Sequence, residues 1–234
     1  MKSIIKLFIF ISLCFASYSK TITVGTHYSP PWSDGKCFGA EIDIIKESFS
    51  YSNIKVQCKY FSYARLVRSF INKEIDFASP ITKFDGDVVK AFYSDNFIPY
   101  VDVALGLKNQ TISVNDLSQY NIVAYQGAKN YLGDKYVSAV SKSPSYFETS
   151  DRDSQLEMLK SHRVELIVGE KNIMINLASK IIKKDVYTNV VLKKWDIRAA
   201  SYDKELIESF NKGLRIMKKK NRIKEIFKKF NIIH

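Results

Sequence analysis

Short β-rich runs alternate with helical patterns in the first third of the chain, and this order strongly constrains the fold. Apolar residues such as Ile42, Ile45 and Phe49 recur at helical spacing, whereas the runs between such patterns are short and rich in β-branched residues. The expected order is strand 21–26, helix 39–50, strand 54–60, helix 63–72 and strand 75–78. A β-α-β-α-β order predicts an α/β fold with a parallel sheet and right-handed crossovers.

A second unit with the same logic begins near Thr111. Its expected elements follow a further strand at residues 101–107 and comprise strand 121–125, helix 154–161 and strand 164–168. The chain crosses back around residues 190–195, and helices at 204–219 and 222–230 then pack on the first unit. We therefore expect two lobes joined by two hinge crossings, each a mainly parallel sheet flanked by helices. The first comprises residues 20–107 and 195–234, and the second comprises residues 108–194.

The N-terminus has the pattern of a secretory signal peptide. Lys2 and Lys6 precede an apolar run at residues 7–16, and small or polar residues end and follow it. We expect residues 1–19 to be removed on export and the mature protein to lie in the periplasm. A lipoprotein signal at Cys14 is less well matched, because bulky Leu13 stands where a small residue is wanted.

Cys37 and Cys58 are the two cysteines that remain beyond the expected signal. An oxidising compartment allows them to pair, and both lie at the same edge if their neighbouring strands are parallel partners. The alternative is two free buried thiols.

Composition argues against several function classes. The net charge is +12, but the lysines are spread along the chain without a basic groove interleaved with aromatic residues, so no nucleic-acid partner is expected. The three histidines lack metal-ligand spacing. No phosphate-binding loop or nucleophile elbow is apparent, and we expect neither a metal nor another cofactor.

Seven segments occur in one order and together resemble a known family. They are GAEIDII (39–45), YARLVRSFINKEID (63–76), SPIT (79–82), FYSDNFIPY (92–100), NIVAYQGA (121–128), HRVELIVGE (162–170) and FNKGLRIMKKKNRIKEIFKKF (210–230). The chain resembles the bacterial extracellular solute-binding proteins of family 3, the polar amino-acid receptors of ABC importers. This resemblance implies a type II-like periplasmic binding fold and a monomer without catalytic activity. It also implies closure of the lobes on a small polar solute and its delivery to an inner-membrane permease.

The resemblance also assigns ligand contacts in the first lobe. Tyr28 and Trp32, with His27, match an aromatic wall after the first strand, Tyr63 matches a stacking ring, and Ser79 and Thr82 match a hydroxyl-bearing turn. Other readings remain open. The loop that carries Tyr28 and Trp32 can pack on its own lobe, and Tyr63 can be a core tyrosine. The turn with Ser79 and Thr82 can be an ordinary capping turn without a ligand contact.

In the second lobe the resemblance assigns Gly127, Ala128 and Glu170. Gly127 and Ala128 stand where the family has Gly followed by Ser or Thr, so a hydroxyl is lost while backbone amides remain. Glu170 stands where an acid meets the ligand's α-ammonium. The alternative is a salt bridge from Glu170 to Lys171 or Lys129.

One expected ligand contact is missing. Asp85 stands where the family's amino-acid binders place an Arg that forks onto the ligand's α-carboxylate. Arg65, two residues after Tyr63, is the candidate replacement, although Arg65 and Arg68 can equally form a solvated face. The ligand is therefore expected to be an amino acid or a related compound that keeps an amine.

Two other functions use the same fold. A cyclohexadienyl dehydratase would need an acid and a base facing each other, for which Glu170, His27 and Glu41 are the available groups. A sensory binding module would have to signal through a partner.

Overall fold

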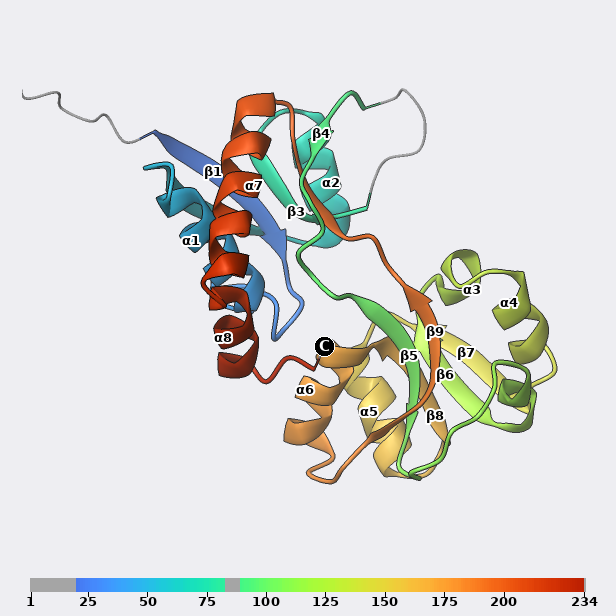
Figure 1. Ribbon diagram of the computed structural model, residues 1–234. Helices are drawn as coiled ribbons and strands as arrows, with labels where there is room; N and C mark the ends of the chain where they lie inside the picture. Colours follow the sequence, from blue (N-terminus) through green and yellow to red (C-terminus); the bar gives the residue numbers. More distant parts are fainter. Residues whose placement is uncertain (1–19, 83–88, 234) are drawn as a thin grey trace, which may run out of the picture.

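The computed structural model describes residues 20–82 and 89–233, which form two lobes, each built on one sheet (Figure 1). Among these residues there are two five-stranded sheets, and each combines two parallel pairings with two antiparallel ones. Helices flank both sheets. The predicted α/β two-lobe class is confirmed, but each sheet is mixed and not mainly parallel as expected, because β10 and β5 pair antiparallel with both of their neighbours.

The first lobe has the strand order β2-β1-β3-β10-β4. Its strands are β1 (Thr21–His27), β2 (Lys55–Phe61), β3 (Phe77–Ile81), β4 (Phe92–Tyr93) and β10 (Arg198–Ser201), and its helices are α1 (Ala40–Ser50), α2 (Tyr63–Ile71), α7 (Lys204–Lys219) and α8 (Arg222–Lys229). Side chains alternate along β3, so that Phe77 packs in the cluster of α1 and α7 while Ala78 packs in that of α2. Helices α1 and α7 approach closely at Gly213, where an added Cβ would lie 2.1 Å from the Ser48 carbonyl oxygen.

The second lobe has the strand order β7-β6-β8-β5-β9. Its strands are β5 (Val101–Gly106), β6 (Asn121–Tyr125), β7 (Ser145–Thr149), β8 (Leu166–Glu170) and β9 (Tyr187–Lys194). Its helices are the 3-10 helix η2 (Asn115–Gln119), α3 (Ala128–Tyr131), α4 (Asp134–Val140), α5 (Arg152–Lys160) and α6 (Lys171–Ile181). Strands β5 and β8 are buried at every position or nearly so, which agrees with their apolar sequences.

Two sequence expectations are corrected here. The strand Val101–Gly106 pairs with β8 and β9, so it belongs to the second sheet and the boundary expected at residue 107 moves to the segment before β5. The expected turn at residues 79–82 is instead the end of β3, which continues through Ile81. Local sequence cannot show to which sheet a strand belongs or where β3 ends, because both depend on pairing between strands that are distant along the chain.

The first crossing between the lobes runs through Tyr100 and the second through Trp195 and Ile197 (Figure 1). The two crossings touch, because the Trp195 amide donates a hydrogen bond to the Tyr100 carbonyl at 2.9 Å. The C-terminal segment also contacts the second lobe at the lobe junction. The side chain of Asn172 on α6 exchanges hydrogen bonds with the backbone of Ile233, at 2.8 and 3.3 Å.

A disulfide joins Cys37, in the loop before α1, to Cys58 on β2, with a Cα–Cα distance of 5.9 Å. The expected signal peptide at residues 1–19 lies outside the described residues, and so does Asp85, which stands at the position of the family's carboxylate-binding Arg. Within the described part of the chain, no helix combines the length and apolar character that crossing a membrane requires.

Candidate functional site

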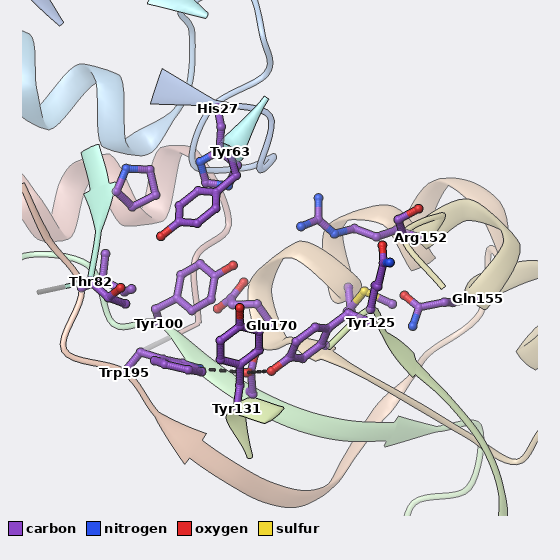
Figure 2. A pocket seen from close by; sticks show the side chains of 17 residues that line it. His27, Tyr63, Thr82, Tyr100, Tyr125, Tyr131, Arg152, Gln155, Glu170 and Trp195 are labelled. Carbon is purple, nitrogen blue, oxygen red and sulfur yellow. Dashed lines mark hydrogen bonds between the residues drawn. The ribbon is translucent and has the colours of Figure 1, made fainter. Parts of the chain in front are cut away.

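A cavity of about 570 Å³ lies between the two lobes and receives side chains from both (Figure 2). Many of its residues lie at or just after the carboxyl ends of parallel strands β1, β3, β6, β7 and β8, where α/β sheets commonly bind ligands. It is lined by His27, Tyr63, Pro80, Thr82, Tyr100, Asp102, Tyr125, Gln126, Tyr131, Ser150, Arg152, Gln155, Gly169, Glu170, Met174, Trp195 and Ile197.

The first-lobe wall is formed by His27, Tyr63 and Thr82. His27 ends β1, and its ring meets that of Tyr63 edge-on at a centroid distance of 5.3 Å. Burial, assisted by the nearby Arg152 guanidinium, lowers the pKa of His27 to about 4, so the imidazole is neutral at pH 7. Burial raises the pKa of Tyr63, although hydrogen bonding with Thr82 acts in the opposite direction. This wall therefore presents neutral, aromatic and hydroxyl groups.

Glu170 occupies the second-lobe wall at the end of β8. It is 4% exposed, and its Oε2 accepts hydrogen bonds from the Ile173 amide at 2.7 Å and from Trp32 Nε1 at 3.4 Å. Burial raises its pKa to about 7 despite these bonds. The alternative salt bridge to Lys171 or Lys129 is not formed among the described residues. A ligand cation would therefore meet a carboxyl group that forms no ion pair with a described residue.

Three first-lobe candidates do not line the cavity. Trp32 is 1% exposed and packs edge-on against Phe227, so it supports Glu170 from behind. Tyr28 is 44% exposed and contributes its carbonyl to Arg152. Arg65 lies on the surface with its guanidinium over the Phe61 ring at 5.9 Å, so the structure does not place it as the replacement carboxylate ligand.

Ser79 also lies away from the cavity. It is fully buried and donates a hydrogen bond to the carboxyl group of Glu41. This position follows from the continuation of β3, which carries Ser79 inside the sheet instead of into a turn.

Gly127 and Ala128 begin α3 beside the cavity, but a protein carboxylate already occupies the amides there. The Gly127 amide donates to Glu148 Oε2 at 2.7 Å and the Lys129 amide donates to Oε1 at 3.0 Å. Gly127 has φ +88, a left-handed conformation that favours glycine. Burial acts to raise the pKa of Glu148, but bonds from Tyr146 and the two amides lower it overall. The predicted anion seat is filled by Glu148.

Sequence reasoning missed most of the second-lobe wall, above all Asp102 and Arg152. Asp102 is a lone acid inside the buried apolar strand VDVALG, a signal that could have been followed. Arg152 is the first residue of α5 and extends into the cavity (Figure 2). The sequence does not show that α5 begins at the cavity, because this depends on how β7 and β6 pair.

No group of three or more His, Cys, Asp or Glu side chains suited to a metal ion occurs within the described ranges.

A sequence model of the bacterial extracellular solute-binding proteins, family 3, matches residues 22–232. No curated protein sequence matches the chain significantly.

Solved structures share this fold at low sequence identity. The probable amino-acid ABC transporter extracellular-binding protein of Bacillus subtilis has a TM-score of 0.75 and 18% identity, covering 92% of this chain and 99% of its own. An ancestral arginine-binding protein bound to arginine has a TM-score of 0.67 and 20% identity, with coverages of 90% and 97%. An ancestral amino acid-binding protein, a precursor of cyclohexadienyl dehydratase, has a TM-score of 0.67 and 17% identity, with coverages of 90% and 94%.

Proposed function

The chain belongs to the bacterial extracellular solute-binding proteins, family 3, and from this premise we propose that it captures an amine-containing polar solute, in the first instance an amino acid. We propose further that it is exported by an N-terminal signal peptide, acts as a monomer in the periplasm and delivers its ligand to an ABC importer. The Bacillus subtilis structure, which is named as a probable amino-acid ABC transporter extracellular-binding protein, supports the proposed role in transport.

The observation that carries this proposal is Glu170 in the wall of an interlobe cavity. Its carboxyl group is buried and its pKa is raised to about 7, so the ligand-free site holds an acid whose ionised form is poorly stabilised. A ligand ammonium would favour the ionised form by direct charge pairing. The wall that contains Glu170 is therefore suited to binding a cation.

Lobe closure follows from where the lining residues come from. Tyr63 and Thr82 belong to the first lobe and Glu170 to the second, so a ligand that contacts all three favours the closed arrangement. A ligand shifts a conformational equilibrium only by its differential affinity for the two states, and contacts to both lobes provide that difference. Closure would then mark the loaded protein for a permease.

The proposal predicts a melting-temperature shift with an amino acid. A ligand at 100 times its Kd stabilises the folded state by about 2.7 kcal/mol, which raises Tm by roughly 5 to 10 °C in a chain of this size. We expect at least one of the twenty amino acids to give such a shift in a thermal scan of the mature protein.

The matched control uses two glutamates of the same lobe. Glu170→Gln should reduce the shift strongly, because it removes the charge that pairs with the ligand amine. Glu157→Gln, at an exposed position of α5, should leave the shift unchanged. A scan in which no amino acid moves Tm, or in which both variants behave alike, would contradict the proposal.

A same-fold enzyme is the second candidate, favoured by Glu170 and His27 lining one cavity. The raised pKa of Glu170 suits a general acid, and neutral His27 suits a base. Incubation with prephenate or arogenate separates the two functions, since a dehydratase forms an aromatic product and a binding protein returns the substrate intact.

A further inference from the structure

Two acids and one guanidinium line the cavity. Asp102 on β5 and Glu170 on β8 are direct partners in the antiparallel register, so their side chains lie on the same face of the sheet. Arg152 reaches the cavity from the start of α5, on the side away from Trp195 in Figure 2. The cavity therefore complements a ligand with two cationic groups and one anionic group.

Asp102 is held with one oxygen engaged. Its Oδ2 accepts hydrogen bonds from Trp195 Nε1 at 2.8 Å and from the Tyr125 hydroxyl at 2.9 Å, which Figure 2 marks with dashed lines. Its Oδ1 accepts no hydrogen bond from a described residue. Asp102 is only 3% exposed, and burial raises its pKa although the charges of Lys193 and Arg152 act in the opposite direction. No lysine or arginine of the described chain lies within 4 Å of its carboxylate.

Aromatic rings surround this acid. Tyr131 and Trp195 meet edge-on at a centroid distance of 6.3 Å, and Tyr125 donates to the acid directly. Lys193 Nζ lies 3.8 Å from the centroid of the Trp195 ring and donates a hydrogen bond to the Tyr131 carbonyl at 2.7 Å, so it covers one face of this ring and leaves the other aromatic surfaces to a ligand. Aromatic faces and a carboxylate oxygen together form a site for an ammonium or guanidinium group.

Arg152 is the cavity's fixed positive charge. Its Nη1 donates one long hydrogen bond, at 3.4 Å, to the Tyr28 carbonyl, and no carboxylate of the described residues lies within 4 Å of the guanidinium. The backbone amides at the start of α3 are not free for an anion, because Glu148 fills them. A ligand carboxylate thus has Arg152 as its cationic partner among the described lining residues.

One buried acceptor lies beside Arg152 on the same face of α5. Gln155 is fully buried and donates through Nε2 to the Val168 carbonyl at 3.4 Å, while its Oε1 has no hydrogen-bond partner within residues 20–82 and 89–233. Gln155 lines the cavity, so its Oε1 is an acceptor for a ligand amine. This unpartnered atom is a second sign that the second-lobe wall is completed by a ligand.

We propose that Asp102 and Arg152 set the specificity of the site for an amino acid with a cationic side chain. The side-chain cation binds Asp102 among Tyr125, Tyr131 and Trp195, and the α-carboxylate binds Arg152. This inference rests on the proposed binding function and refines it, leaving the α-ammonium to Glu170. It also places the carboxylate contact on the second lobe.

Titration calorimetry with matched ligands tests both contacts. L-arginine is compared with citrulline, which replaces the guanidinium by a neutral urea, and with agmatine, which lacks the carboxylate. L-lysine, norleucine and cadaverine form the same series with an ammonium. We expect arginine or lysine to bind at least tenfold more tightly than both of its analogues.

The variants assign each contact to its residue. Asp102→Asn should remove most of the preference for the cationic side chain over its neutral analogue. Arg152→Gln should weaken the amino acid tenfold or more and leave its decarboxylated analogue unchanged within about a factor of two. Exposed Arg163→Gln, in the same lobe, should change neither. Circular dichroism melts verify that each variant is folded.

The outcomes separate this inference from the proposed function. If the wild-type protein binds a neutral amino acid as tightly as arginine and lysine, the binding function stands and the specificity inference is overturned. It is likewise overturned if Arg152→Gln weakens amino acid and decarboxylated amine equally, because that result indicates a structural role. If no amino acid binds, the proposed function fails first.

Discussion

Glu41 is a buried carboxyl group with no ion-pair partner in the part of the chain that the structure describes. It is 0% exposed, Ser79 donates to one of its oxygens, and the other oxygen, Oε2, has no hydrogen-bond partner among the described residues. Burial raises its pKa to about 8, and the Ser79 bond only partly opposes this. At neutral pH the folded protein therefore keeps Glu41 protonated, and its ionisation disfavours folding.

This carboxyl group predicts a pH-dependent loss of stability. The unfolded pKa is near 4.5 and the folded pKa near 8, so the folded state binds more protons across that window. Its contribution is present below pH 4.5 and is lost as pH rises toward 8. Glu41→Gln should therefore lose less stability than the wild type between pH 5 and pH 8, measured by urea unfolding.

The control for that experiment is Glu47→Gln on the same helix, where Glu47 is partly buried and forms an ion pair with Arg222. Glu47→Gln should lose as much stability as the wild type between pH 5 and pH 8. If the free energy of unfolding changes with pH in the same way in the wild type and in Glu41→Gln, the prediction is wrong. The buried carboxyl group would then be ionised or hydrated in the folded protein.

At single positions, the sequence predicted residues that carry a family pattern and missed those that do not. Tyr63, Thr82 and Glu170 were expected from the resemblance, and the structure places all three in the cavity wall. Asp102 and Arg152 match no such pattern. Their position depends on the pairing of β5 with β8 and on the place where α5 begins, neither of which is encoded locally.

At the scale of elements, periodicity located the long helices well. The buried residues of α7, such as Phe210, Leu214 and Met217, repeat at helical spacing, and its bounds agree with the expected residues 204–219. The short strands β4 and β7 and the helices α4 and α6 were not expected. A strand of two residues such as β4 leaves no period to detect, and it forms only because β10 pairs with it.

The loop before α1 is tied to β2 by the Cys37–Cys58 disulfide, which closes a segment with a sequence separation of 21. A cross-link of this size lowers the entropy of the unfolded chain by an amount worth roughly 3 kcal/mol. Reduction, or the double change Cys37→Ser and Cys58→Ser, should lower Tm by roughly 6 to 12 °C. The far-UV spectrum should stay the same.

Differential scanning calorimetry with and without reductant makes this measurement. The serine variant is the control for reductant, since its Tm should not respond to it. An unchanged Tm in the reduced wild-type protein would mean that the bond contributes nothing to stability.

For the whole molecule, two crossings connect the lobes, and contacts between them include the hydrogen bonds Asn172–Ile233, Trp32–Glu170 and Arg152–Tyr28. A clamp predicts a more compact protein on saturation, because the ligand contacts both lobes. Small-angle scattering should show a smaller radius of gyration with the ligand that raises Tm. Glu170→Gln at the same ligand concentration is the control and should scatter like the ligand-free protein. Identical curves for free and saturated wild type would exclude closure on binding.

The hydrogen bond from Trp195 to Asp102 ties the second crossing to β5 at the cavity wall, so a ligand that binds Asp102 acts directly beside the hinge. A small shift at Asp102 would then change the angle between the lobes, and the separation of helices α1 and α4, which lie on opposite sides of the crossings, would change with it (Figure 1). Fluorescent labels on those two helices are therefore the sensitive reporters of occupancy, whereas labels beside the crossings would barely register it.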